Sequence, residues 1–179
     1  KVYWTEIVPG LRWTHENYSV IKQYDLETGK VTILTPRGRY LAPAIDKDNR
    51  TAAVSRFTVS GENQLVLVDL ATGKDQRYFT VPDNAFIKEL TYDDNGTITA
   101  VAVTATGISL LQLDTQTGAW SEMLATTSVN ITAPLWSNGK LFFESGANGT
   151  NNIYYLNPSD TATYRLTSAR FGAFDPAFT

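Results

Sequence analysis

One short motif returns four times along this chain of 179 residues, at nearly constant spacing. Each copy places an Asp or Asn at the end of a strand-like run, and three of the four follow it closely with Thr-Gly. The anchoring positions are Asp25, Asp69, Asp114 and Asn157, so successive steps are 44, 45 and 43 residues. A fixed period of this length is typical of repeat architectures and constrains the fold before any local propensity does.

Each clear copy of the motif predicts a β-hairpin. Gly accepts the positive φ of a tight turn, while Asp and Asn can hydrogen-bond to their own nearby backbone. The run 64–68 leads into the copy at Asp69 with the β-branched and apolar residues expected of a strand. Similar short runs fill the rest of each unit, and no helical period of useful length occurs. A full unit is therefore predicted to be four short antiparallel strands.

Four-stranded units of this length predict the blades of an all-β β-propeller. We expect about four repeats, at 1–40, 41–85, 86–130 and 131–172, and the first strand of a further or closing blade at 173–179. Two assemblies fit: a closed ring of four blades in which the two ends meet, or an arc of a larger propeller. Because both ends fall inside strand-like runs, we expect a piece of a longer protein.

A second pattern recurs where units open. Ala42-Pro43, Ala133-Pro134 and Asp175-Pro176 each begin a strand-like run, where Pro removes no ladder donor, whereas the third unit has Lys88-Glu89. Together with the Asn-Gly turns and the D-L-x-T-G-K motif, this resembles the TolB-like propeller repeats. Related WD-like repeats occur in tricorn protease and in the propellers of prolyl-oligopeptidase-type peptidases. The resemblance covers nearly the whole chain and implies the fold well but the function poorly.

Composition excludes several classes of function. The net charge is −3 with scattered basic residues, so we expect no nucleic-acid partner. The chain has no cysteine, which removes disulfides, thiolate chemistry and Cys-based zinc sites. It has no apolar run long enough to span a membrane. The G-x-S-x-G, Walker-type and G-x-G-x-x-G motifs are absent, so neither a catalytic residue nor a cofactor is predicted.

No metal site is predicted either. His15-Glu16 supplies half of a zinc-peptidase H-E-x-x-H, but Ser19 stands where the second His must be. The acidic turns at 46–48 and 93–96 lack the twelve-residue ligand spacing of a calcium loop, so they are interpreted as ordinary hairpin turns.

The candidate binding residues are aromatic and basic side chains in loops that a propeller gathers on one face. These loops enter a blade or join its second and third strands. Arg and aromatic residues dominate binding hot spots, and Arg pairs bidentately with carboxylates. The alternative is that they only pack or form solvated charges. The candidates are Arg12, Trp13, His15, Glu16, Arg37, Arg39, Tyr40, Arg56, Phe57, Arg170 and Phe171.

Two functions follow as hypotheses. The first is a non-catalytic propeller that binds or scaffolds a protein or peptide, including flanking domains of the same polypeptide. The TolB resemblance and the Thr- and Asn-rich strands favour an extracytoplasmic location, periplasmic or at the cell surface. The second is a substrate-gating propeller of a larger hydrolase or peptidase whose catalytic domain lies outside these residues.

Overall fold

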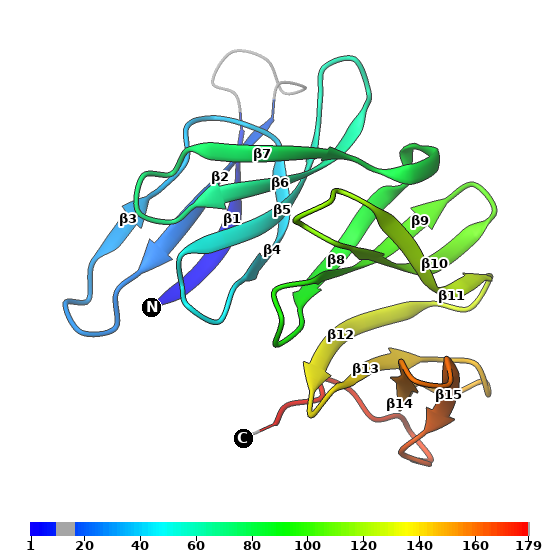
Figure 1. Cartoon of the computed structure of the whole chain (residues 1–179). Helices are drawn as coiled ribbons and strands as arrows, with labels where there is room; N and C mark the ends of the chain where they lie inside the picture. Colours follow the sequence, from blue (N-terminus) through cyan, green and yellow to red (C-terminus); the bar gives the residue numbers. More distant parts are fainter. Residues whose placement is uncertain (10–16, 179) are drawn as a thin grey trace. The chain divides into compact units, whose positions relative to one another are not determined.

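The computed structural model describes residues 1–9 and 17–178. These residues form antiparallel sheets joined by turns, with one short 3₁₀ helix (Figure 1). The chain divides into two compact units, Lys1–Asn84 and Ala85–Thr179, and each contains two sheets. Within the described ranges, no helix is long and apolar enough to cross a membrane.

Unit 1 contains a three-stranded and a four-stranded sheet, each in sequential strand order. The first consists of β1 (Val2–Val8), β2 (Tyr18–Tyr24) and β3 (Val31–Ile33). The second consists of β4 (Tyr40–Ile45), β5 (Thr51–Phe57), β6 (Asn63–Asp69) and β7 (Asp75–Thr80), and the helix η1 (Pro82–Asn84) ends the unit.

Unit 2 contains two four-stranded sheets, again in sequential order. One consists of β8 (Phe86–Tyr92), β9 (Ile98–Thr104), β10 (Gly107–Leu113) and β11 (Trp120–Thr127). The other consists of β12 (Ile131–Ser137), β13 (Lys140–Ser145), β14 (Asn152–Asn157) and β15 (Ala162–Arg165). The predicted all-β architecture of antiparallel blades is confirmed, with three strands rather than four in the first sheet.

The repeated motif forms the turn between the last two strands of each sheet. In the three clear copies, the Gly N–H donates to the carbonyl of the anchoring Asp at 2.8 Å, and the φ values are +69°, +67° and +78° for Gly29, Gly73 and Gly118. The fourth copy follows the same path with Thr161, whose N–H donates to the Asn157 carbonyl at 2.9 Å and whose φ is +53°. Positive φ is uncommon for any residue but Gly, and a β-branched residue there is an outlier.

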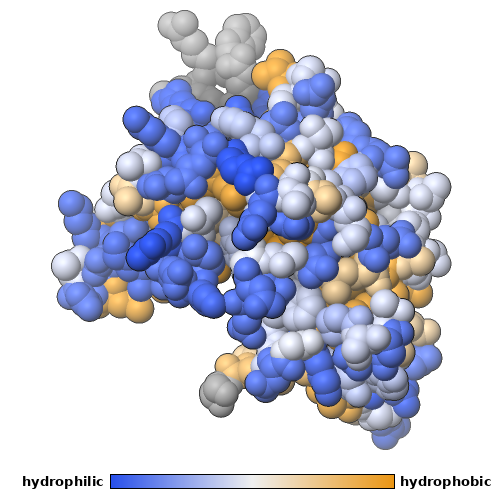
Figure 2. All heavy atoms as spheres, in the orientation of Figure 1, coloured by the Kyte–Doolittle hydropathy of each residue, from blue (hydrophilic) through white to orange (hydrophobic). Residues whose placement is uncertain are grey.

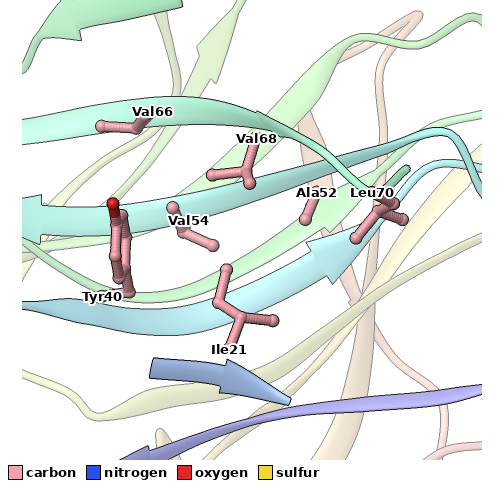
Figure 3. Close-up of a cluster of buried hydrophobic side chains, with 7 residues drawn as sticks. All are labelled: Ile21, Tyr40, Ala52, Val54, Val66, Val68 and Leu70. Atoms are coloured by element: carbon pink, nitrogen blue, oxygen red, sulfur yellow. The ribbon is translucent and has the colours of Figure 1, made fainter. Parts of the chain in front are cut away.

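Each unit has its own apolar core. Figure 3 shows that of unit 1, where Ile21 of β2 faces Tyr40 and the alternate small side chains of β5 and β6. In unit 2 the corresponding cluster is built on Val101, Leu110, Leu141 and Phe143, all nearly or fully buried. Full burial of such a large apolar side chain contributes roughly 1.5–3 kcal/mol, so each cluster stabilises its unit.

Residues 166–178 form no strand, although a strand was expected to start within 173–179. The segment does carry a feature of the first strands. Asp175 has φ +52° and its N–H donates to Oε1 of Glu144 at 2.6 Å. Ala133, at the start of β12, has φ +48° and donates its N–H to Oε2 of Glu89 at 2.5 Å. No described strand lies paired with 173–178, so its backbone lacks the ladder that defines a strand.

Candidate binding surface

Two arginines of unit 1 stack on aromatic rings beside the loop that enters the second sheet. The guanidinium carbon of Arg37 lies 4.5 Å from the centroid of the Tyr18 ring, and that of Arg39 lies 4.9 Å from the centroid of the Phe57 ring. Both distances are those of cation–π contacts. We call these four residues, Tyr18, Arg37, Arg39 and Phe57, the arginine surface.

The backbone between the two arginines is clamped. The Ser19 N–H donates to the Gly38 carbonyl at 2.7 Å, and the Gly38 N–H donates back at 3.0 Å. The Ser19 hydroxyl also donates to the Tyr40 carbonyl at 2.7 Å. Position 38 must be Gly, because a Cβ there would lie 2.4 Å from the Tyr40 ring. The loop therefore presents Arg37 and Arg39 from a fixed backbone.

The arginine surface adjoins a small apolar pocket of about 250 Å³. Ile7, Leu41, Phe57 and Arg39 are among the residues that line it. A larger hollow of about 560 Å³ shares part of this lining and is also lined by Arg37 and the loop after β5. That loop carries Val59, whose side chain is 93% exposed, and its tip is coloured as hydrophobic in Figure 2.

A third arginine nearby is already neutralised. Nη1 of Arg56 pairs with Oδ2 of Asp75 at 2.8 Å, and the same carboxylate accepts hydrogen bonds from the hydroxyls of Tyr40 and Tyr78. Tyr40 is only 3% exposed, and burial, followed by the charge of Asp75, raises the pKa of its phenol to about 12. Arg56 and Tyr40 thus belong to an internal network that holds β4, β5 and β7 together.

The predicted site residues fall into four groups. Arg37, Arg39 and Phe57 come together on the arginine surface, whereas Tyr40 and Arg56 lie in the network beside it. Arg170 stacks on Phe171 at 5.2 Å in unit 2, where Phe171 is 86% exposed. The remaining candidates, Arg12, Trp13, His15 and Glu16, lie outside the described residues.

Sequence reasoning missed three members of this region: Tyr18, Ile7 and Leu41. All three lie in strands, whereas the candidates were selected from predicted loops. The available signal was position, because Tyr18 follows the loop that contained the first candidates. In the parts of the chain that the structure describes, no three His, Cys, Asp or Glu side chains gather as metal ligands would.

No protein-family model matches this chain, and no curated protein does. Solved structures do match. TolB from Acinetobacter baumannii matches at 17% identity and a TM-score of 0.70, over 93% of this chain and 41% of that one. A putative TolB from Agrobacterium tumefaciens matches at 13% identity and a TM-score of 0.74, over 96% of this chain and 64% of that one. The β-propeller domain of the Trilobed protease from Pyrococcus furiosus matches at 12% identity and a TM-score of 0.61, over 93% of this chain and 53% of that one.

This chain thus spans less than two thirds of each of these propeller structures. Four blades that match only part of a longer propeller chain fit an arc of a larger propeller. At these identities the likeness concerns the fold and not the site. The chain therefore has the fold of the TolB-like β-propellers.

Proposed function

We propose that this chain is a non-catalytic β-propeller module that binds a protein or peptide partner through the arginine surface. One observation carries the proposal: two guanidiniums are held over aromatic rings, beside an apolar pocket, on a clamped loop. Preorganised aromatic and Arg side chains next to a pocket are the composition of a binding hot spot.

The charge of the surface supports binding rather than packing. No carboxylate of the described residues forms an ion pair with Arg37 or Arg39, whereas Arg56 is paired with Asp75. A structural arginine is normally paired or satisfied when it is held in place, as Arg56 is. The two stacked arginines instead offer their donors to solvent or to a ligand.

The test is partner capture with the double variant Arg37→Ala/Arg39→Ala. We expect the native protein to retain partners that the double variant loses, with an unchanged unfolding temperature, because neither side chain is in the core. Arg77→Ala is the matched control, since Arg77 also stacks on a ring, that of Phe79 at 4.8 Å, but on β7 and away from the surface. Equal capture by the native protein and the double variant would contradict the proposal.

A second candidate function is a gating propeller of a larger peptidase. Its support is the match to the β-propeller domain of the Trilobed protease. Mass spectrometry of the native polypeptide tests it, because a flanking segment with a catalytic signature is expected under this function and not under the first. For the location, we propose an extracytoplasmic site, on the likeness to TolB structures, and cell fractionation tests it.

For the domain organisation, we propose that residues 173–178 are the first strand of another blade. The support is that Asp175 and Ala133 share a positive φ, a following Pro and a carboxylate from the preceding blade that accepts their N–H. In the native polypeptide, the amides of 174 and 177–178 should exchange with solvent as slowly as those of β12. Glu144→Ala should accelerate them and the exposed Glu122→Ala should not. Fast exchange in the unmutated protein would contradict this organisation.

A further inference from the structure

The pocket beside the arginine surface is sized for one side chain. Ligand pockets for small molecules typically measure roughly 300–1,000 Å³, and this one measures about 250 Å³. Its walls include Ile7, Leu41 and the ring of Phe57, which are apolar. A pocket of this size and lining suits an aliphatic or aromatic side chain that projects from a larger ligand.

The charged side chains that the structure shows lining the pocket and the adjoining hollow are all cationic. Arg39 borders both the pocket and the adjoining hollow, and Arg37 lines the hollow. Among the described residues, no acidic side chain lines either of them. The carboxylate of Glu6, which lies in the same unit, is engaged by Nζ of Lys22 at 2.6 Å. An anionic group next to the buried side chain of a ligand would therefore meet two cations and no described competing anion.

The two arginines are also oriented before a ligand arrives. Each guanidinium rests on a ring, and the Ser19–Gly38 bridge holds the backbone between them. A guanidinium stacked by its face keeps its N–H donors at the edge, which is the geometry that binds a carboxylate bidentately. Little conformational entropy then remains to be lost on binding.

From this arrangement we infer that the arginine surface recognises a peptide at two adjacent points, a carboxylate at Arg37 and Arg39 and an apolar side chain in the pocket. The inference rests on the proposed function and specifies its ligand. The carboxylate has two possible sources with the same chemistry, the C-terminus of a peptide and the side chain of an Asp or Glu next to the apolar residue.

Three fluorescently labelled peptides separate these sources. The first ends in Gly-Ser-Leu with a free carboxylate, the second ends in the same residues as an amide, and the third ends in Gly-Glu-Leu as an amide. Binding is measured by fluorescence polarisation with the whole protein. We expect the first or the third peptide to bind at least about tenfold tighter than the second, because the second has no carboxylate to accept a charge-assisted hydrogen bond from the arginines. If only the first peptide binds tightly, the recognised group is the C-terminal carboxylate. If the first and third bind equally, the surface accepts a carboxylate from either source.

The protein variants locate the two contacts. Arg37→Ala/Arg39→Ala should abolish the difference between the acid and the neutral peptide, and Arg77→Ala should preserve it. Replacing Leu by Ala in the acid peptide should weaken its binding several-fold, since one apolar side chain leaves the pocket. The tenfold difference should also shrink as salt is added.

Two results would overturn the inference. One is equal affinity for all three peptides, and the other is no measurable binding of any of them. Neither overturns the proposed function, which would still stand if partner capture depended on Arg37 and Arg39. Conversely, if capture is unaffected by the double variant, the proposed function fails whatever the peptides show.

Discussion

The turn at Asp69 in unit 1 and the turn at Asn157 in unit 2 follow the same backbone path with different side chains. In the first, Oδ1 of Asp69 accepts hydrogen bonds from the N–H groups of Ala71 and Thr72 at 2.9 and 2.7 Å and from the Thr72 hydroxyl at 2.9 Å. In the second, the one donor to Oδ1 of Asn157 among the described residues is the Ser159 N–H, at 3.5 Å.

In the second turn, the accepting carboxylate belongs to Asp160 and not to the residue at the anchoring position, Asn157. Asp160 accepts the Ala162 N–H at 2.9 Å and the Tyr164 hydroxyl at 3.1 Å. The Gly position is taken by Thr161 at φ +53°. The comparison indicates that the flanking strands determine the backbone path of the turn, while its side chains determine the free energy of adopting that path.

The substitution with the largest expected effect on stability is Gly73→Ala. A Cβ at Gly73 would lie 1.7 Å from the Leu34 carbonyl oxygen, and the φ of +67° disfavours any side chain. We expect the free energy of unfolding to fall by about 3 kcal/mol or more, from strain and a backbone clash together. Urea unfolding followed by tryptophan fluorescence measures it.

The matched control is Gly29→Ala. Its φ is +69°, but the only atom near a new Cβ is the Tyr24 hydroxyl at 3.8 Å. It should lose about 1 kcal/mol, from backbone strain alone. Equal losses for the two variants would show that the contact with Leu34 does not matter.

A gain of stability is expected from Thr161→Gly. The substitution removes the strain of a β-branched residue at positive φ, and it gives up the bond from the Thr161 hydroxyl to the Asp160 carbonyl at 2.8 Å. Since Gly also increases the entropy of the unfolded chain, the net gain should be about 1 kcal/mol. A thermal melt measures it, with Thr163→Gly on the neighbouring strand as a control that should destabilise. Destabilisation by Thr161→Gly would mean that the hydroxyl outweighs the strain.

The smallest expected effect is on acid stability. The Thr72 hydroxyl and then the Thr72 N–H hold the pKa of Asp69 below its usual value of about 3.9. Its contribution to stability is therefore complete above that usual value and is lost as the pH falls through the lowered pKa of the folded state. Asp69→Asn should flatten the decline of the urea midpoint below about pH 4. An Asn157→Ser variant, which removes no carboxylate, should leave the decline unchanged, and an unchanged decline in Asp69→Asn would exclude this role.

Much of the fold was predictable because it is local and repeated. The spacing of Asp25, Asp69 and Asp114 with their glycines predicted the hairpins, and the runs between them predicted the strands. Two features were not local. Glu89 stands where β4 and β12 have Pro, and its carboxylate reaches the N–H of Ala133, 44 residues later. Thr161 occupies the position where the other copies have Gly. Its positive φ follows from the backbone path of the turn and not from its own conformational preference.

The candidate surface was predictable in part. Loop position and residue type were enough to select Arg37, Arg39 and Phe57. They could not separate these from Arg56 and Tyr40, because the separation depends on Asp75, which lies 19 and 35 residues away in the sequence. The pocket was missed, because its lining residues Ile7, Tyr18 and Leu41 come from three strands of two different sheets, β1, β2 and β4.

The carboxylate of Glu89 accepts a backbone N–H of the strand that follows, and that of Glu144 accepts a backbone N–H of the segment 173–178. In both cases a proline follows the donor residue, and the hydrogen bond uses no side chain of that residue. This contact is therefore insensitive to the identity of the donor, which is Ala133 in one copy and Asp175 in the other. The apolar packing between neighbouring sheets depends on side chains instead, as Leu110 and Phe143 show in unit 2.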